Sequence, residues 1–418
     1  MLALSVLLVL PLSSAVPWIR DDWSRAKEEA LRQKKLVGVE VWATWSQTCL
    51  SMRVNVLKTP AFEAIAPKLV WLSVEHDSPR NEEFLAKFPI SAFPTYLVID
   101  PETDTAVARW VGAGTIEQTT RAFATAERHT ADVMILGQQA LAREDHAEAI
   151  RLLSAALPRE RKNPRRTLVL GEYIEALWKT NPRACAELGL RHLLETDHTP
   201  PGIDFVGIAS YCAASLDAPR TRKLREAVVT RLEAALMLER SPLTVDDLSS
   251  VLEVLTDTAD ALGETKKAEE YAKRRAAILE AARAEAKDFE AKAIYVADLV
   301  DVLLRLKRFS DAERVLVEAE AAAPDDFNNP YRLAVVLQQA GRFDDALTAI
   351  DRGLAKSYGP RRLKLLSTQI DLLTSKQKKK EAQELLDRTK AEAARFNPRL
   401  LPVNWARRVE EQERELAP

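Results

Sequence analysis

An almost unbroken apolar run at residues 36–43 limits the fold more than any other stretch of the sequence. A strand with one exposed face alternates apolar and polar residues, whereas a strand covered on both faces can be apolar throughout. The run therefore predicts a buried strand in a sheet that carries helices on both sides, which is an α/β arrangement. Trp42, Trp45 and Cys49 stand at the end of this strand, where the chain turns into a predicted helix.

The flanking segments predict the rest of a small α/β domain. Helical spacing of apolar residues predicts helices over about residues 21–35, 50–65, 81–88 and 115–128. Further strands are expected at residues 69–74, 95–99 and 106–111, and the last two form a hairpin around a turn that contains Asp100 and Pro101. The expected order is helix, strand, helix, strand, helix, hairpin, helix.

This order and two motifs resemble the thioredoxin family over about residues 19–130. Trp42-Ala43-Thr44-Trp45 followed by Ser46-Gln47-Thr48-Cys49 is similar to the family's active-site segment, in which Trp-Ala-x-Trp precedes Cys-x-x-Cys. Phe93-Pro94-Thr95 matches the x-Pro-Thr that the family places beside this turn. The resemblance implies a cis Phe93–Pro94 bond, although cis is a minority state for X–Pro. It also implies a peptide-binding edge formed by Trp45, Phe93, Pro94 and Thr95.

Ser46 stands where the family has its attacking cysteine. Thiol–disulfide exchange needs a thiolate, which a serine hydroxyl cannot replace. Serine at a helix start is a favoured N-cap. Cys49, one turn further on, is expected to be a sheltered core residue, and a reactive Cys49 is the alternative. Glu40 falls on the position of the family's buried acid, and a surface carboxylate at a strand edge is the other interpretation.

From Ala131 onward, helical patterns separated by Pro, Gly or Asx replace the strand signals. Ala312, Ala346 and Ala382 each begin an apolar-periodic helix, at spacings of 34 and 36 residues. A period near 34, with a helix pair per unit and a small residue where helices meet, resembles the tetratricopeptide repeat (TPR). The resemblance implies an all-α solenoid of about seven helix pairs with a concave face for a protein or peptide. A structural spacer without a partner is the other interpretation.

Cys185 and Cys212 fall on successive predicted helices, at residues 182–194 and 203–216. An oxidising compartment would allow a disulfide between them, and two buried free thiols are the alternative. The five histidines show no metal-ligand spacing, and no glycine-rich phosphate loop follows a strand, so the sequence predicts no metal and no cofactor. With 60 basic and 62 acidic residues, the chain has no clustered basic excess for a nucleic acid.

An apolar run at residues 2–12, followed by Ser13-Ser14-Ala15, predicts a secretory signal, because a bilayer span needs about 20 residues. We expect a signal peptide at residues 1–15, a thioredoxin-like domain at residues 16–130 and a TPR-like helical repeat domain at residues 131–418. No transmembrane segment is expected in the mature protein.

The sequence thus predicts a periplasmic or secreted protein that acts as a non-redox binding or scaffold factor. Its protein or peptide partner is expected on the concave face of the repeats and on the thioredoxin-like turn. The alternative is a thiol–disulfide oxidoreductase that acts through Cys49 together with a thiol of its partner.

Overall fold

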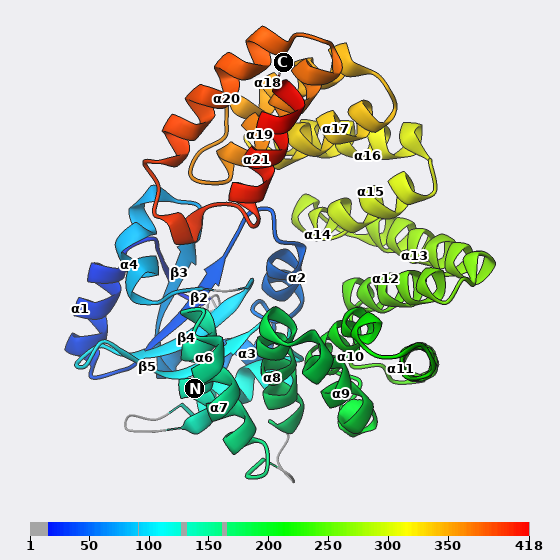
Figure 1. Ribbon diagram of the computed structural model, residues 1–418. Helices are drawn as coiled ribbons and strands as arrows, with labels where there is room; N and C mark the ends of the chain where they lie inside the picture. Colours follow the sequence, from blue (N-terminus) through cyan, green and yellow to red (C-terminus); the bar gives the residue numbers. More distant parts are fainter. Residues whose placement is uncertain (1–15, 91, 127–131, 161–164, 418) are drawn as a thin grey trace, which may run out of the picture.

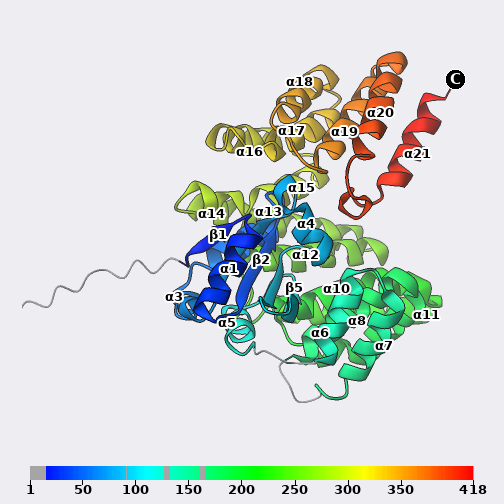
Figure 2. The same cartoon turned by 90° about the vertical axis from the view of Figure 1, so that its left-hand side faces the viewer.

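The computed structural model describes residues 16–90, 92–126, 132–160 and 165–417. The predicted signal at residues 1–15 and the predicted domain boundary between residues 130 and 131 lie outside them. Over the described residues, a mixed sheet with its helices is followed by helices alone, which curve around one side of the sheet domain (Figure 1). Figure 2 shows the arc from the side, with its first and last helices at opposite ends of the sheet domain.

The sheet has the strand order β1-β3-β2-β4-β5. The first three strands of the chain pair in parallel, whereas β4 is antiparallel to β2 and β5 is antiparallel to β4. The strands are β1 (Trp18–Arg20), β2 (Val37–Trp42), β3 (Val70–Glu75), β4 (Thr95–Asp100) and β5 (Thr105–Val111). Every residue of β3 and β4 is buried, and so is all of β2 except Trp42, which confirms the α/β prediction.

Helices cover both faces of the sheet. They are α1 (Trp23–Gln33), α2 (Gln47–Asn55), α3 (Pro60–Glu63), α4 (Glu82–Lys87) and α5 (Ile116–Ala124), with 3-10 turns η1 (Ala66–Lys68) and η2 (Pro79–Asn81). On one face, Ala26 of α1 and Phe84 of α4 pack in the core that contains Val39. On the other face, Phe62 and Phe123 pack around the fully buried Trp71. The sheet therefore separates two apolar cores.

The rest of the described chain forms an array of helix hairpins. Consecutive helices pair as α6 (Val133–Ala142) with α7 (His146–Ala156), α8 (Arg166–Thr180) with α9 (Pro182–His192), α10 (Pro200–Cys212) with α11 (Ala218–Leu236), α12 (Val245–Ala261) with α13 (Thr265–Glu285), α15 (Val296–Arg305) with α16 (Phe309–Ala322), α17 (Asn328–Gln339) with α18 (Phe343–Leu354), and α19 (Arg362–Ser375) with α20 (Lys379–Ala393). Between or after these pairs lie α14 (Phe289–Ala293), α21 (Trp405–Leu416) and the 3-10 turns η3 (Leu193–Glu195) and η5 (Pro398–Leu400), while the 3-10 turn η4 (Ala213–Ser215) joins α10 to α11.

The repeat alanines lie at the contacts between helices. Ala312, Ala346 and Ala382 each have an exposed fraction of 0% and stand in the first turn of α16, α18 and α20. A methyl group lets neighbouring helices approach closely, and each hairpin then covers an apolar face of the one before. The small residue that marks the period in the sequence is thus a packing requirement of the array.

Replacing Ala346 with tryptophan should destabilise the protein by about 1–3 kcal/mol, because the indole would overpack a filled core. Urea unfolding measures this loss. Ala322→Trp, at the exposed end of α16, is the matched control and should leave the unfolding midpoint unchanged. Equal midpoints for the two variants would show that Ala346 has room beside it.

Candidate functional site

The predicted turn joins β2 to α2 and is capped by Ser46. Its Oγ accepts a hydrogen bond from the backbone N–H of Cys49 at 3.4 Å. Serine satisfies here one of the N–H groups that have no partner within the helix. Cys49 has an exposed fraction of 0%, and burial raises the pKa of its thiol to about 12 in spite of a hydrogen bond with Ser46. The turn therefore shelters a protonated thiol.

Glu40, on β2 directly before the turn, is a buried acid. Its exposed fraction is 1%, and its carboxylate forms an ion pair of 2.9 Å with Arg53 of α2. The guanidinium of Arg53 also lies 3.3 Å from the centroid of the Trp42 ring and donates a hydrogen bond to Ser73. Of the two interpretations of Glu40, the structure therefore supports the buried acid, with Arg53 as its counter-charge.

The residues of the predicted peptide-binding edge lie together beside the turn. The Phe93–Pro94 bond is cis, and Thr95 is fully buried with its Oγ1 donating to the carbonyl oxygen of Ala92. The rings of Trp45 and Phe93 meet edge to face with centroids 5.2 Å apart. The edge thus brings residues 45 and 93–95 next to the cap of α2.

Helices of the array contact the same turn from the other side. The Gln47 side chain accepts a hydrogen bond from the backbone N–H of Asp298 in α15. Two side chains of α17 donate to the turn, Asn328 to Thr44 Oγ1 at 3.2 Å and Arg332 to the carbonyl oxygen of Trp45 at 3.1 Å. The turn and the inner side of the arc, which were both predicted to bind a partner, are therefore in contact with each other in this structure.

A second junction lies where the loop between α18 and α19 meets the end of β3. The Tyr358 hydroxyl donates to Glu75 at 3.2 Å, and the backbone of Gly359 lies against that of Asp77. Asp77 in turn accepts a hydrogen bond from the indole N–H of Trp45 at 2.7 Å. Burial, and then the charge of Asp77, raise the pKa of Glu75 to about 7. The loop thus reaches the turn through Asp77.

Two cationic side chains of the array contact Trp45, and a third lies near Tyr331. Arg361 lies over its ring at 4.5 Å from the centroid, and Arg332 binds its carbonyl oxygen. Lys364 lies 5.9 Å from the centroid of the Tyr331 ring. Burial, followed by the charges of the two arginines, lowers the pKa of Lys364 to about 8. Trp45 therefore meets positive charge from α17 and from Arg361, the cap residue of α19.

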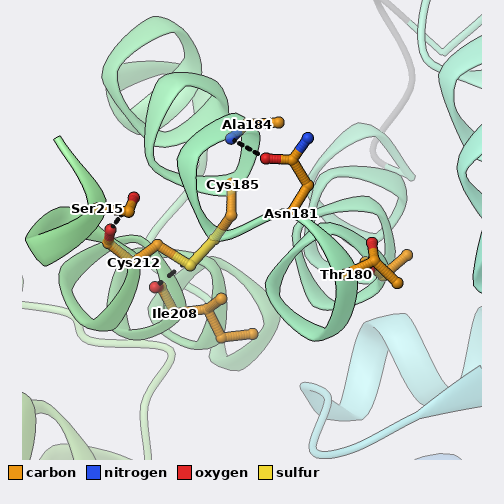
Figure 3. Close-up of a disulfide and its surroundings, with 8 residues drawn as sticks. Thr180, Asn181, Ala184, Cys185, Ile208, Cys212 and Ser215 are labelled. Atoms are coloured by element: carbon orange, nitrogen blue, oxygen red, sulfur yellow. Dashed lines mark hydrogen bonds between the residues drawn. A yellow bond between two sulfur atoms is a disulfide. The ribbon is translucent and has the colours of Figure 1, made fainter.

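Cys185 and Cys212 are joined by a disulfide between α9 and the end of α10 (Figure 3). Their Cα atoms are 6.0 Å apart, within the usual range for such a bond. Asn181 caps α9 next to it by accepting a hydrogen bond from Ala184 N–H. Cys49 is then the only free cysteine. Within the described ranges, no cluster of His, Cys, Asp and Glu could hold a metal ion.

The sequence matches two family models that agree with this architecture. One, described as thioredoxin-like, matches residues 18–101, and the other, described as a tetratricopeptide repeat, matches residues 303–370. The chain thus consists of a thioredoxin-like domain followed by a helical region with tetratricopeptide repeats. This class of protein combines a sheet domain with an array that offers extended surfaces to protein partners. In the part of the chain that the structure describes, no helix is both long and apolar enough to cross a membrane.

Solved structures that resemble the chain include three tetratricopeptide repeat proteins. A tetratricopeptide repeat protein from Parabacteroides merdae is 14% identical, with 68% of this chain and 97% of that chain covered and a TM-score of 0.42. A thermophilic TPR protein from Thermus thermophilus is 18% identical, with 58% and 97% covered and a TM-score of 0.31. The TPR2AB domain of yeast Sti1 in its pHSP90 complex is 15% identical, with 68% and 96% covered and a TM-score of 0.26. A search of curated proteins gave no match.

Stability should fall as the pH rises from about 6.5 to about 8. Burial raises the pKa of Glu75 to about 7, of Asp204 to about 7 and of Glu172 to about 8, all above their ordinary values. The folded protein therefore binds more protons than the unfolded chain in this window, and this contribution is lost as the pH passes the raised values. The lowered pKa values of His198 and Lys364 act in the opposite direction, His198 only at the lower end of the window and Lys364, at about 8, only at its upper end, so the three carboxyl groups dominate.

Urea unfolding at the two ends of this window measures the effect, which we expect to be about 1–3 kcal/mol. Glu75→Gln should flatten the dependence, because its amide oxygen can still accept the hydrogen bond from Tyr358 while the titrating group is gone. A midpoint that rises with pH in the unsubstituted protein would contradict the raised pKa values.

Proposed function

We propose that this protein is a non-redox binding or scaffold factor for protein partners. The observation that carries the proposal is the state of Cys49, which is fully buried behind a capping serine. With a pKa of about 12, the fraction of thiolate at neutral pH is on the order of 10⁻⁵. Exchange with a disulfide needs the thiolate, and it needs access to the sulfur as well.

The partner surface belongs to the same proposal. The turn and the inner side of the array make hydrogen bonds with each other through Gln47, Thr44 and Trp45. A partner that uses this part of the turn must therefore compete with α15 and α17. Such a partner must replace the hydrogen bonds that Gln47, Thr44 and Trp45 make with the array.

We propose further that the protein works outside the cytoplasm, in the periplasm or after secretion. The support is the bond between Cys185 and Cys212, because disulfides persist in oxidising compartments and are rare in the cytosol. The predicted signal at residues 1–15 agrees with this location and stays a prediction. N-terminal sequencing of the protein purified from its native cells tests both.

Alkylation separates the binding function from the alternative, an oxidoreductase that acts through Cys49. Iodoacetamide at neutral pH should leave Cys49 of the native protein unmodified over hours, while the same reagent in concentrated urea adds one group. Mass spectrometry counts the adducts. Rapid modification of the native protein, or reduction of insulin by it, would support the oxidoreductase instead.

Replacing Ser46 with cysteine should produce a disulfide with Cys49 under a mild oxidant. Two residues lie between the positions, and residue 46 is the cap of the helix that contains Cys49, so the sulfurs come within bonding reach. Mass spectrometry should show the loss of two hydrogens in the peptide that contains both positions. Thr48→Cys is the matched control, because a bond between adjacent residues is disfavoured. If Ser46→Cys stays reduced, the turn has lost the geometry of a redox site altogether.

A further inference from the structure

The loop at residues 196–199 joins η3 to α10, where the array meets the thioredoxin-like domain. Thr199, the N-cap residue of α10, accepts a hydrogen bond on its Oγ1 from the Gln118 side chain of α5 at 3.2 Å. Asp197 holds this threonine, because its Oδ1 accepts from the backbone N–H of Thr199 at 3.2 Å and from its hydroxyl at 2.5 Å. The loop therefore makes a contact between the two parts of the chain.

The loop packs directly against the first turn of α10. A Cβ at Gly202 would lie 2.1 Å from the carbonyl oxygen of Asp197, so the two backbones are in close contact. Pro201, in the same turn, lines a cavity of about 360 Å³ together with Gly112 of the thioredoxin-like domain. A displacement of the loop should therefore move the start of α10, which faces the thioredoxin-like domain.

His198 of this loop is held in its neutral form by a hydrogen bond with Arg231 of α11. Arg231 Nη1 lies 2.6 Å from His198 Nε2, and Nη2 of the same guanidinium donates to the carbonyl oxygen of Thr196. Arginine is always charged and only donates, so Nε2 must accept, which an imidazole can do only when it is neutral. The ring hydrogen is then on Nδ1, which is buried and has no hydrogen-bond partner among the described residues.

The groups around His198 disfavour a second proton on its ring. Burial, and then the positive charge of Arg231, lower the pKa of His198, and these effects outweigh the attraction of Asp197. The Asp197 carboxylate is engaged with Thr199 instead. Further charged groups close to the loop in the sequence pair with one another, and these are Glu195 of η3, Arg166 of α8 and His192 of α9. Protonation of His198 therefore places a new cation beside Arg231.

We propose that His198 and Arg231 form a pH-sensitive switch, which fastens the loop before α10 to α5 at neutral pH and loosens this contact in acid. Protonation removes the lone pair of Nε2, so the hydrogen bond from Arg231 is lost and two positive charges face each other. The loop then moves away from Arg231, and Thr199 moves away from Gln118. This inference goes beyond the proposed function, because it concerns the coupling of the two parts of the chain and not the state of Cys49.

The loop should open more often as the pH falls below about 6.5, the ordinary pKa of histidine. The pKa of His198 is lowered in the closed loop, so opening takes up a proton. The equilibrium constant for opening should then rise by up to about tenfold for each unit of pH, until the closed form is protonated as well.

Hydrogen exchange of the full chain between about pH 5 and about pH 8 tests the switch. Mass spectrometry follows the exchange, and an unstructured peptide at each pH corrects for the chemical effect of pH on the rates. The corrected exchange of residues 196–206 and of α5 should rise as the pH falls. His198→Gln should abolish this rise, because its amide oxygen can accept the hydrogen bond from Arg231 at every pH.

Two matched controls remove other imidazole groups. His146→Gln changes a histidine at the start of α7, and His192→Gln changes the histidine that pairs with Glu195 next to the loop. Both variants should keep the rise in exchange. Loss of the rise in His192→Gln, or an unchanged rise in His198→Gln, would overturn the proposal.

A further measurement needs no variant. NMR of the protein with isotope-labelled histidine at about pH 8 should show His198 with its hydrogen on Nδ1 and none on Nε2. A hydrogen on Nε2 would overturn the proposal, because this nitrogen could not then accept from Arg231. A rise in exchange confined to residues 196–206, with α5 unaffected, would also overturn it, because the loop would then open without loosening the thioredoxin-like domain.

Discussion

Replacing Gly359 with alanine is expected to destabilise the protein by about 2–5 kcal/mol and to loosen the junction between the array and the thioredoxin-like domain. Gly359 has a φ of +60°, which other residues rarely adopt, and a Cβ there would lie 2.1 Å from the carbonyl oxygen of Asp77. The carbonyl oxygen of Asp77 is a backbone atom, and the added Cβ is bonded directly to the backbone of residue 359. A change of side-chain rotamer therefore cannot relieve the overlap. If the loop moves, the hydrogen bond from Tyr358 to Glu75 is lost. If Asp77 moves instead, its hydrogen bond from the Trp45 indole is lost.

Gly341 provides the control for this substitution. It has a φ of +77°, and a Cβ there would have nothing within 4 Å. Gly341→Ala should therefore cost only the backbone strain, about 1–2 kcal/mol. Urea unfolding compares the two variants, and alkylation of Cys49 reports whether the turn becomes accessible in Gly359→Ala alone. Equal losses in the two variants, with Cys49 still protected in both, would show that the contact with Asp77 contributes nothing.

Features that depend on local periodicity could be predicted from the sequence. The apolar run at residues 36–43 predicted a strand covered on both faces, and all but the last residue of β2 are buried. The spacing of Ala312, Ala346 and Ala382 predicted contacts between helices, and all three are fully buried. Ser46 at a helix start predicted the cap that its Oγ makes. In each case the feature is caused by the residue itself and by residues close to it in the sequence.

The closure of the array on the turn could not be predicted in this way. Arg332 and Trp45 are 287 residues apart, and Asp298 and Gln47 are 251 apart. Their contact depends on the curvature of the arc, which is the sum of small rotations between many helix pairs. No single segment of the sequence determines that curvature. The sequence therefore predicted two binding surfaces but gave no sign that they meet.

A cavity between the thioredoxin-like domain and the array, with Asp204 of α10 in its lining, has one local signal in the sequence. Asp204 is the only charged residue in α10, whose other residues are apolar, small or neutral. A charge in such a helix faces either solvent or a polar site inside the protein. The sequence does not distinguish these cases, because the groups that share the cavity with Asp204 come from α8, α12 and the thioredoxin-like domain.

Arg275 of α13 is the most heavily paired buried cation of the array among the described residues. Its exposed fraction is 4%, and its guanidinium binds Glu253 at 2.9 Å, Asp301 at 3.2 Å and the hydroxyl of Ser249 at 2.9 Å. Asp298, whose backbone N–H binds Gln47 of the turn, lies 3.6 Å from the same side chain. Arg275 therefore connects the core between α12, α13 and α15 to the contact with the thioredoxin-like turn.

Replacing Arg275 with methionine is expected to cost about 3 kcal/mol, at the lower end of the range for breaking a buried ion pair, because Glu253 and Asp301 retain access to water. Burial raises the pKa of Glu253 to about 7, even though the positive charge of Arg275 lowers it. Without Arg275 the pKa of Glu253 should rise further. The loss should thus be larger at about pH 8, where Glu253 ionises, than at about pH 6, where it accepts a proton. Arg352→Met, which breaks a surface pair with Glu320, should cost about 0–1 kcal/mol at either pH. Urea unfolding of both variants at both pH values measures the four losses. A loss in Arg275→Met that matches the control, or that shrinks as the pH rises, would show that the three acids do not depend on Arg275 for their charge balance.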